Sequence, residues 1–173
     1  MGLGSVPVQV TTQCDTPQAQ TSTPIQAQIQ AASPEFFYFT HNSTGQNAIA
    51  AVNAVTGAYI GAPGLVSGGS FTPAKHDDYL TLYATGFGTT NPSFAPGQLP
   101  NVAAPVTASY TISFGGVTLD QAHILYVGAS QYAGLYQVNI QVPDSVPAGD
   151  QPLVITIGGA SSPSAAYITV ASN

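Results

Sequence analysis

This chain of 173 residues has a formal net charge of −6, only 5% charged residues, and Lys75 as its one basic side chain. A single lysine cannot neutralise a phosphate backbone or an anionic lipid surface, which excludes nucleic acid as a partner and electrostatic membrane binding. Hydrophobic residues make up 44% of the sequence, enough for a sizeable core. No uninterrupted run of roughly 18 apolar residues is present, so we expect no membrane insertion.

The polar surface is expected to consist of Gln, Asn, Ser and Thr, because lysine is so scarce. This composition is typical of exported proteins, and we expect an extracellular or cell-surface location. The first residues lack the basic and apolar regions of a signal peptide. We therefore expect the numbering to begin after a removed signal or within a longer exported chain.

Residues 1–32 predict an N-terminal β-hairpin or strand extension. Apolar residues in two stretches alternate with Gln, Thr and Pro, which gives each strand one apolar and one uncharged polar face. The apolar positions are Val6, Val8 and Val10 in the first stretch and Ile25, Ala27 and Ile29 in the second. Pro7 and Pro24 lack an amide donor and favour strand edges or starts.

Residues 33–70 predict an aromatic strand segment followed by a connector. The aromatic cluster from Phe36 to Phe39 must be buried or must meet a partner. Residues 46–54 read as a strand, with a short helix over 47–55 as the less favoured alternative. Glycine, proline and serine dominate residues 61–70, which form the best candidate for a domain boundary.

Residues 71–173 show regular strand signals separated by turns. About seven short strands with turns every 8–12 residues are typical of an immunoglobulin-like antiparallel β-sandwich, so the predicted fold class is all-β. The side chains expected to face the core are Tyr136, Val138, Ile140, Leu153, Ile155 and Ile157.

Two motifs in this part resemble a known family. The first runs from Tyr83 to Gly88 and is followed by Asn91-Pro92; the second runs from Gly134 to Pro143 and is followed by Pro147-Ala148-Gly149. They resemble the Solibacter-type uncharacterised C-terminal domain of exported acidobacterial proteins, which is similar to the immunoglobulin-like IPT/TIG modules. The resemblance spans roughly residues 71–170. It implies a β-sandwich and export, and it implies no catalytic residue.

The last strands of the chain echo the first ones. Residues 148–157 and 165–170 repeat the pattern of residues 4–11 and 23–29, and both read as the closing hairpin of a sandwich. We expect Leu153–Ile157 to pair with Ile168–Val170. The N-terminal copy has no sandwich before it, and few charges protect its edges. We therefore expect it to pair with a neighbouring subunit, through the side chains of Val6, Val8, Val10, Ile25 and Ile29.

Few residues suggest chemistry, so we expect no enzyme, no cofactor and no metal site. The histidines His41, His76 and His123 are not accompanied by a Gly-x-Ser-x-Gly nucleophile turn. His76, Asp77 and Asp78 could offer metal ligands, but no repeated ligand spacing supports them, and the two aspartates read as a solvated turn.

Two single residues are candidates for covalent modification. Cys14 is the one cysteine, so it is either a free thiol near a turn or half of an intermolecular disulfide. Asn42 begins an Asn-Ser-Thr sequon on a predicted turn, which makes it a candidate for glycosylation that depends on the host.

The sequence therefore predicts a non-enzymatic extracellular structural module that binds copies of itself head to tail, as in a cell-surface filament. One alternative is a carbohydrate-binding or adhesive module of a larger exported protein, with polysaccharide as its partner. A row of exposed tyrosines would favour this alternative, and the candidates are Tyr79, Tyr83, Tyr126, Tyr132 and Tyr136. Another alternative is a spacer domain without a specific partner.

Overall fold

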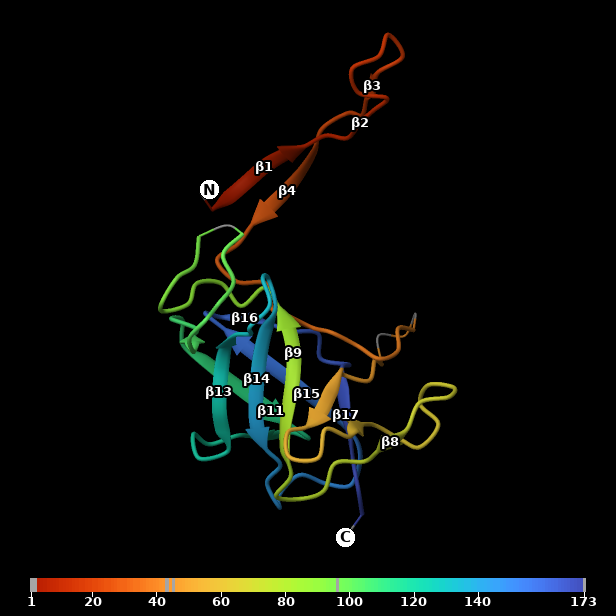
Figure 1. Ribbon diagram of the computed structural model, residues 1–173, viewed down its shortest axis with the longest axis vertical. Coiled ribbons are helices and arrows are strands. Elements are labelled where there is room, and N and C mark those ends of the chain that lie inside the picture. Colours follow the sequence, from red (N-terminus) through yellow and green to blue (C-terminus); the bar gives the residue numbers. More distant parts are fainter. Residues whose placement is uncertain (1–2, 43, 45, 96, 173) are drawn as a thin grey trace. The chain divides into compact units, whose positions relative to one another are not determined.

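A computed structural model describes residues 3–42, 44, 46–95 and 97–172. The chain divides into two compact units, Met1–Ala31 and Ala32–Asn173, which we call unit 1 and unit 2. All the elements of the described residues are strands (Figure 1). No helix in these residues is long and apolar enough to cross a membrane.

Unit 1 consists of two consecutive strand pairs. Strand β1 (Gly4–Val8) pairs antiparallel with β4 (Ile25–Ile29), and β2 (Thr11–Thr12) pairs with β3 (Gln20–Thr21). The expected N-terminal hairpin is therefore present. Val10 lies between β1 and β2 rather than inside a strand, and its amide donates to the side chain of Ser22.

Unit 2 is built from two sheets. The first has eight strands in the order β10-β13-β14-β9-β6-β7-β8, with β5 paired to β9. The second has the order β12-β11-β15-β16, with β17 also paired to β15. Their bounds are β5 Glu35–Phe36, β6 Ala51–Asn53, β7 Tyr59–Ile60, β8 Phe71–Thr72, β9 Tyr79–Thr85, β10 Ala104–Pro105, β11 Tyr110–Phe114, β12 Val117–Thr118, β13 Ile124–Ala129, β14 Tyr136–Gln141, β15 Gly149–Ile157, β16 Ala160–Ser161 and β17 Tyr167–Val170.

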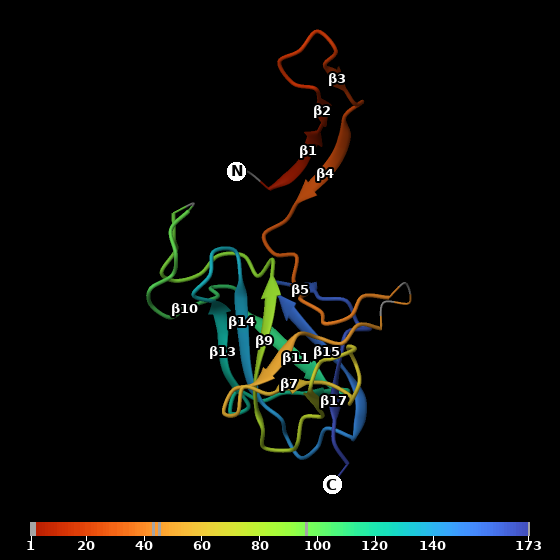
Figure 2. The same cartoon turned by 45° about the vertical axis from the view of Figure 1, so that its right-hand side comes forward.

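The two sheets of unit 2 lie face to face. In both cartoon views β13, β14 and β9 lie side by side in one layer, while β11 and β15 cross behind them in the other (Figure 2). Apolar side chains from both layers fill the space between, as the alternation of their sequences requires. This arrangement confirms the predicted all-β sandwich.

The predicted core positions are also confirmed. Five of the six side chains expected inside are completely buried, namely Val138, Ile140, Leu153, Ile155 and Ile157. The sixth, Tyr136, is half-buried and packs on Phe87 with ring centroids 5.1 Å apart.

Residues 33–70 belong to the sandwich rather than to a separate segment. Strands β5 and β6 both pair with β9, and β7 continues the sheet from β6. The Gly/Pro-rich residues 61–70 connect β7 with β8, and these two strands pair in parallel. The domain boundary expected there lies instead after Ala31. The strand expected over residues 46–54 is shorter, since only Ala51–Asn53 is a regular strand.

One glycine lies where the start of unit 2 crosses the end of β9. Gly86 has a φ of 76°, and a Cβ built there would lie 1.9 Å from the carbonyl oxygen of Ser33. The Ser33 amide donates to the Gly86 carbonyl over 2.8 Å. A residue with a side chain would therefore be strained and would separate these two backbones.

The expected pairing of the closing hairpin was wrong in register. Strand β15 is long enough to have different partners along its length: Gly149–Pro152 pairs with β17, and Thr156–Ile157 pairs with β16. Residues 153–157 pair along their other edge with β11. The difference arises because the short strand β16 follows directly after the Gly158-Gly159 turn and pairs with the end of β15. After five intervening residues the chain pairs with the start of β15 as β17.

A charge placed in this core tests the assignment. Val138→Asp removes about 1.5–3 kcal/mol of apolar burial and adds an unpaired carboxylate to a domain whose total stability is typically about 5–15 kcal/mol. We expect this variant to lose its cooperative thermal transition by circular dichroism. Thr111→Asp is the control, because Thr111 is exposed on β11, and its transition should stay near that of the wild type. A native transition in the Val138 variant would contradict the core assignment.

Candidate functional site

The β1–β4 hairpin of unit 1 has one apolar face. Directly opposed residues of an antiparallel pair point to the same side, and Val6 opposes Ala27 while Val8 opposes Ile25. Ile29 continues this face opposite Gly4. The other face is polar, and there Ser5 Oγ donates to Gln26 Oε1 over 2.8 Å.

Much of this apolar face is exposed. The exposed fraction is 49% for Val8, 62% for Val10 and 73% for Ile25, whereas Val6 and Ile29 are partly covered. The residues predicted for self-association therefore lie together on unit 1, with Val10 just beyond the end of β1. Their pairing with a neighbour remains a prediction.

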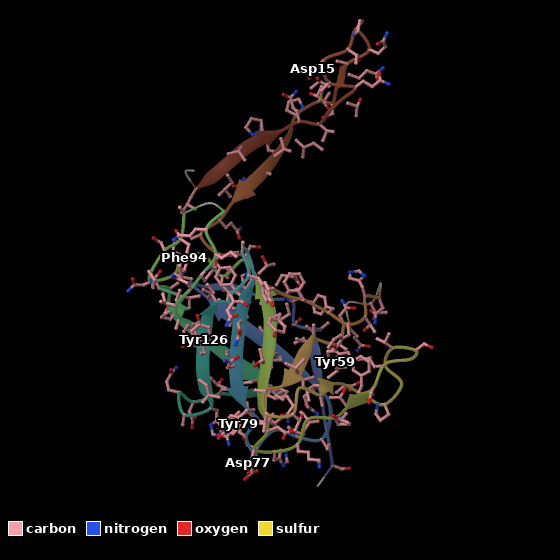
Figure 3. All side chains as sticks on the ribbon, viewed as in Figure 1. Asp15, Tyr59, Asp77, Tyr79, Phe94 and Tyr126 are labelled. Atoms are coloured by element: carbon pink, nitrogen blue, oxygen red, sulfur yellow. The ribbon has the colours of Figure 1, made fainter. Side chains whose placement is uncertain are left out.

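The edges of the hairpin are open and carry no charge. Within the described residues, β1 and β4 pair only with each other and form a two-stranded sheet. Asp15 is the only charged side chain between residues 3 and 31, and it lies in the turn beyond β2 (Figure 3). Because lysines and other charges normally prevent pairing at sheet edges, these two edges are able to accept a further strand.

Cys14 lies in a tight turn of the same unit. The neighbouring residues Gln13 and Asp15 have φ values of 51° and 63°, a conformation uncommon outside glycine. The Cys14 thiol is exposed and donates to the Thr11 carbonyl oxygen over 3.4 Å. It is accessible to another molecule, and the intermolecular disulfide remains a prediction.

Asn42 lies on an exposed turn of unit 2. Its Nδ2, the atom that would carry a glycan, donates to the Gln46 carbonyl oxygen, and its Oδ1 accepts from the amide of Thr44. The middle residue of the sequon, Ser43, lies outside the described residues. Glycosylation of Asn42 remains a prediction.

The tyrosines considered for sugar binding do not form one row. Tyr79 and Tyr83 lie on the outer face of β9, and Tyr126 lies on the same face of β13, opposite Asn139 (Figure 3). Tyr136 points to the other side and packs on the core, where burial raises the pKa of its hydroxyl. Tyr132 lies in an exposed loop.

A cleft of about 630 Å³ opens beside this outer face, and the sequence did not indicate it. Its floor includes Tyr126, Gln137 and Asn139, and one wall is the 99–103 loop. The Asn139 Oδ1 accepts hydrogen bonds from Thr81 Oγ1 at 3.1 Å and from Gln137 Nε2 at 2.8 Å. Gln137 and Asn139 alternate with the buried Val138 and Ile140 along β14, so this amide face follows from the period of two of the strand. The loop that turns the face into a cleft has no comparable sequence signal.

Two of the three histidines, His76 and His123, have hydrogen-bond partners in the structure. His76 Nε2 lies 2.9 Å from the Val146 carbonyl oxygen, and its Nδ1 lies 3.9 Å from Asp144. His123 Nδ1 lies 2.6 Å from Asp120, and the hydrogen bonds with His123 lower the pKa of the Asp120 carboxyl. Within the described residues, no group of three His, Cys, Asp or Glu side chains could hold a metal ion.

Comparisons with protein-family models, with curated proteins and with solved structures return no match.

The exposure of Cys14 leads to a labelling test. In the native protein the thiol should react with Ellman's reagent at a rate close to that of the denatured chain, because it is exposed and holds only one weak hydrogen bond. Air oxidation should then give a disulfide-linked dimer on a non-reducing gel, and Cys14→Ser should abolish that dimer. A native labelling rate more than about a hundredfold below the denatured rate would show that the thiol is covered.

Proposed function

We propose that this chain is a non-enzymatic structural module of the extracellular space or cell surface that associates through unit 1 with a neighbouring subunit. The neighbour in the simplest assembly is a second copy of the chain. The observation that supports the proposal is the exposed apolar face around Val8 and Ile25, on a hairpin whose two edges are open.

Burial of this face would be favourable. A two-stranded hairpin alone is marginally stable in water, and covering one large apolar side chain contributes about 1.5–3 kcal/mol. Few charges would have to be desolvated, because Asp15 is the only charged side chain in this unit. A contact between unit 1 of one copy and a different surface of the next is heterologous, so it can extend into a filament.

The remaining parts of the proposal rest on composition and on the histidine environments. The scarcity of charge and the resemblance to domains of exported proteins support an extracellular location. His76 is hydrogen-bonded to the carbonyl oxygen of Val146, far along the chain, and His123 to Asp120 in its own turn, which supports a structural rather than a catalytic role for these two side chains.

A matched pair of variants tests the self-association. Val8→Asp puts a charge on the apolar face, whereas Gln28→Asp puts the same charge on the polar face of the same hairpin. We expect the wild type and the Gln28 variant to form the same assemblies by sedimentation velocity and electron microscopy. The Val8 variant should be monomeric, with association weakened at least about tenfold by loss of roughly 1.5–3 kcal/mol of burial.

Two results would contradict this proposal. If all three proteins form the same assembly, the apolar face is not the contact. If the wild type is monomeric at high concentration, intact copies of the chain do not associate, and the self-association proposed here is wrong.

A second candidate function, carbohydrate binding, is favoured by the cleft beside Tyr126. Amide side chains and an aromatic ring that line a cleft are suited to sugar hydroxyls and to the apolar faces of sugar rings. Gln137 and Asn139 provide the amides, and Tyr126 provides the ring.

Affinity electrophoresis in gels that contain soluble polysaccharides tests this candidate. Gln137→Ala should weaken retardation by roughly twofold to tenfold, as expected from the loss of one hydrogen bond of about 0.5–1.5 kcal/mol. Gln141→Ala, further along the same strand and outside the cleft, is the control. Equal mobility of the wild type in every polysaccharide gel and in a plain gel would exclude this function.

A further inference from the structure

Unit 1 reproduces the closing strands of unit 2 in register. In unit 2 the pairs run from Gly149 opposite Val170 to Pro152 opposite Tyr167, and in unit 1 they run from Gly4 opposite Ile29 to Pro7 opposite Gln26. The leading glycine has a positive φ in both, 96° at Gly149 and 122° at Gly4. The proline follows at the same spacing in both units.

The likeness extends to side-chain hydrogen bonds beyond these pairs. In unit 1 the Val10 amide donates to Ser22 Oγ at 3.1 Å, and the Ser22 amide donates back to the Val10 carbonyl at 2.9 Å. In unit 2 Ile155 and Ser162 make the same two bonds, at 3.1 Å and 2.9 Å.

The next pair along the strands matches as well. The Thr11 and Thr21 hydroxyls lie 2.9 Å apart, and those of Thr156 and Ser161 lie 2.8 Å apart. The run β1–β2 therefore corresponds to β15, β3 to β16, and β4 to β17. The turn is the main difference, since residues 13–19 replace the Gly158-Gly159 turn.

The two copies differ in what covers them. Leu153, Ile155 and Ala166 are completely buried, whereas their counterparts Val8, Val10 and Ile25 are 49%, 62% and 73% exposed.

The backbone edges differ in the same way. Strand β15 has β11 along one edge, and β17 makes parallel bridges from Tyr167 to Ala48 and from Val170 to Ala74. Within the described residues, unit 1 has no strand at the corresponding edges.

We propose that residues 4–29 are the closing hairpin of a β-sandwich, and that the partner of unit 1 is an immunoglobulin-like sandwich that lacks its own last strands. The proposal rests on the proposed function, in which unit 1 is the contact element, and it specifies the partner. That partner presents a strand like β11 for residues 8–12, a second edge for β4, and an open apolar core for Val8, Val10 and Ile25.

An intact copy of this chain fits that description poorly. Its own β15, β16 and β17 already occupy the position that unit 1 would take, and they are part of the same chain as the sandwich. They also fill the core with larger side chains, since Leu153, Ile155 and Ile157 stand where unit 1 has Val8, Val10 and Thr12. An intact copy can pair with unit 1 only at the outer edges of its sheets. A sandwich without its last strands can accept the whole hairpin in their position, by strand addition.

A graft within the full chain tests whether unit 1 can close a sandwich. Residues 149–170 are replaced by a second copy of residues 4–29. A resized graft also carries Val8→Leu, Val10→Ile, Thr12→Ile and Ile25→Ala in the grafted copy, which restores the volumes of Leu153, Ile155, Ile157 and the completely buried Ala166. The control graft carries Val8→Asp and Val10→Asp there. The readout is hydrogen exchange at the backbone amides of Val138 and Ile140. Both lie on β14, between β9 and β13 in the sheet opposite the graft, so their protection reports whether the sandwich is closed.

We expect protection at these amides in the resized graft to stay within about tenfold of the wild type, and in the control graft to fall at least a hundredfold. The unmodified graft should lie between them, because its side chains do not match the volumes of those that they replace. If the resized graft exchanges as fast as the control, unit 1 is not a closing hairpin and the inference is wrong.

The outcome is independent of whether the wild type assembles. A protected graft together with a monomeric wild type would support the inference and contradict self-association between intact copies. An unprotected resized graft together with wild-type filaments that Val8→Asp abolishes would support the proposed function and overturn the inference.

Discussion

The antiparallel pairing of β15 with β11 is the interaction on which the rest of unit 2 depends. It aligns Leu153, Ile155 and Ile157 opposite Phe114, Ile112 and Tyr110, and five of these six side chains are completely buried. The other edge of β15 holds β16 and β17, and β17 in turn bridges to Ala48 and Ala74, which lie shortly before β6 and shortly after β8 of the first sheet. One long strand therefore organises the second sheet and links it to the first.

The aromatic cluster at residues 36–39 shows how the start of unit 2 joins this core. Phe36 is buried and pairs with Ala84 of β9, whereas Phe37 remains half exposed. Tyr38 donates a hydrogen bond to Glu35, and its burial and the nearby carboxylate raise the pKa of its hydroxyl. Phe39 packs edge-on against Tyr59 and Phe71, with centroids 5.5 Å and 5.0 Å apart. The cluster is thus largely satisfied within its own unit, unlike the apolar face of unit 1.

Unit 1 shows what the same strand pattern does without a partner strand. Unit 1 has the same strand register, the same hydrogen bonds to a serine and the same positive-φ glycine as the closing strands of unit 2. These features need only the paired strands themselves. Burial of Val8, Val10 and Ile25 is not local, since it needs a facing sheet. The low charge of the chain leaves this surface unprotected, as the proposed contact through unit 1 requires.

Strand character, the inward faces and the likeness between the two ends of the chain could be predicted from the sequence. These follow from a period of two, from turn residues and from repeated spacing, all of which are local. Tertiary structure alone decided that residues 33–70 join the sandwich, because β5 and β6 find their partner β9 far along the chain. It also decided that β15 divides its edge between β16 and β17, and that the 99–103 loop forms a cleft beside Tyr126. Pairing between distant segments depends on which edges remain open after the core has formed, and alternation within one strand carries no information about that choice.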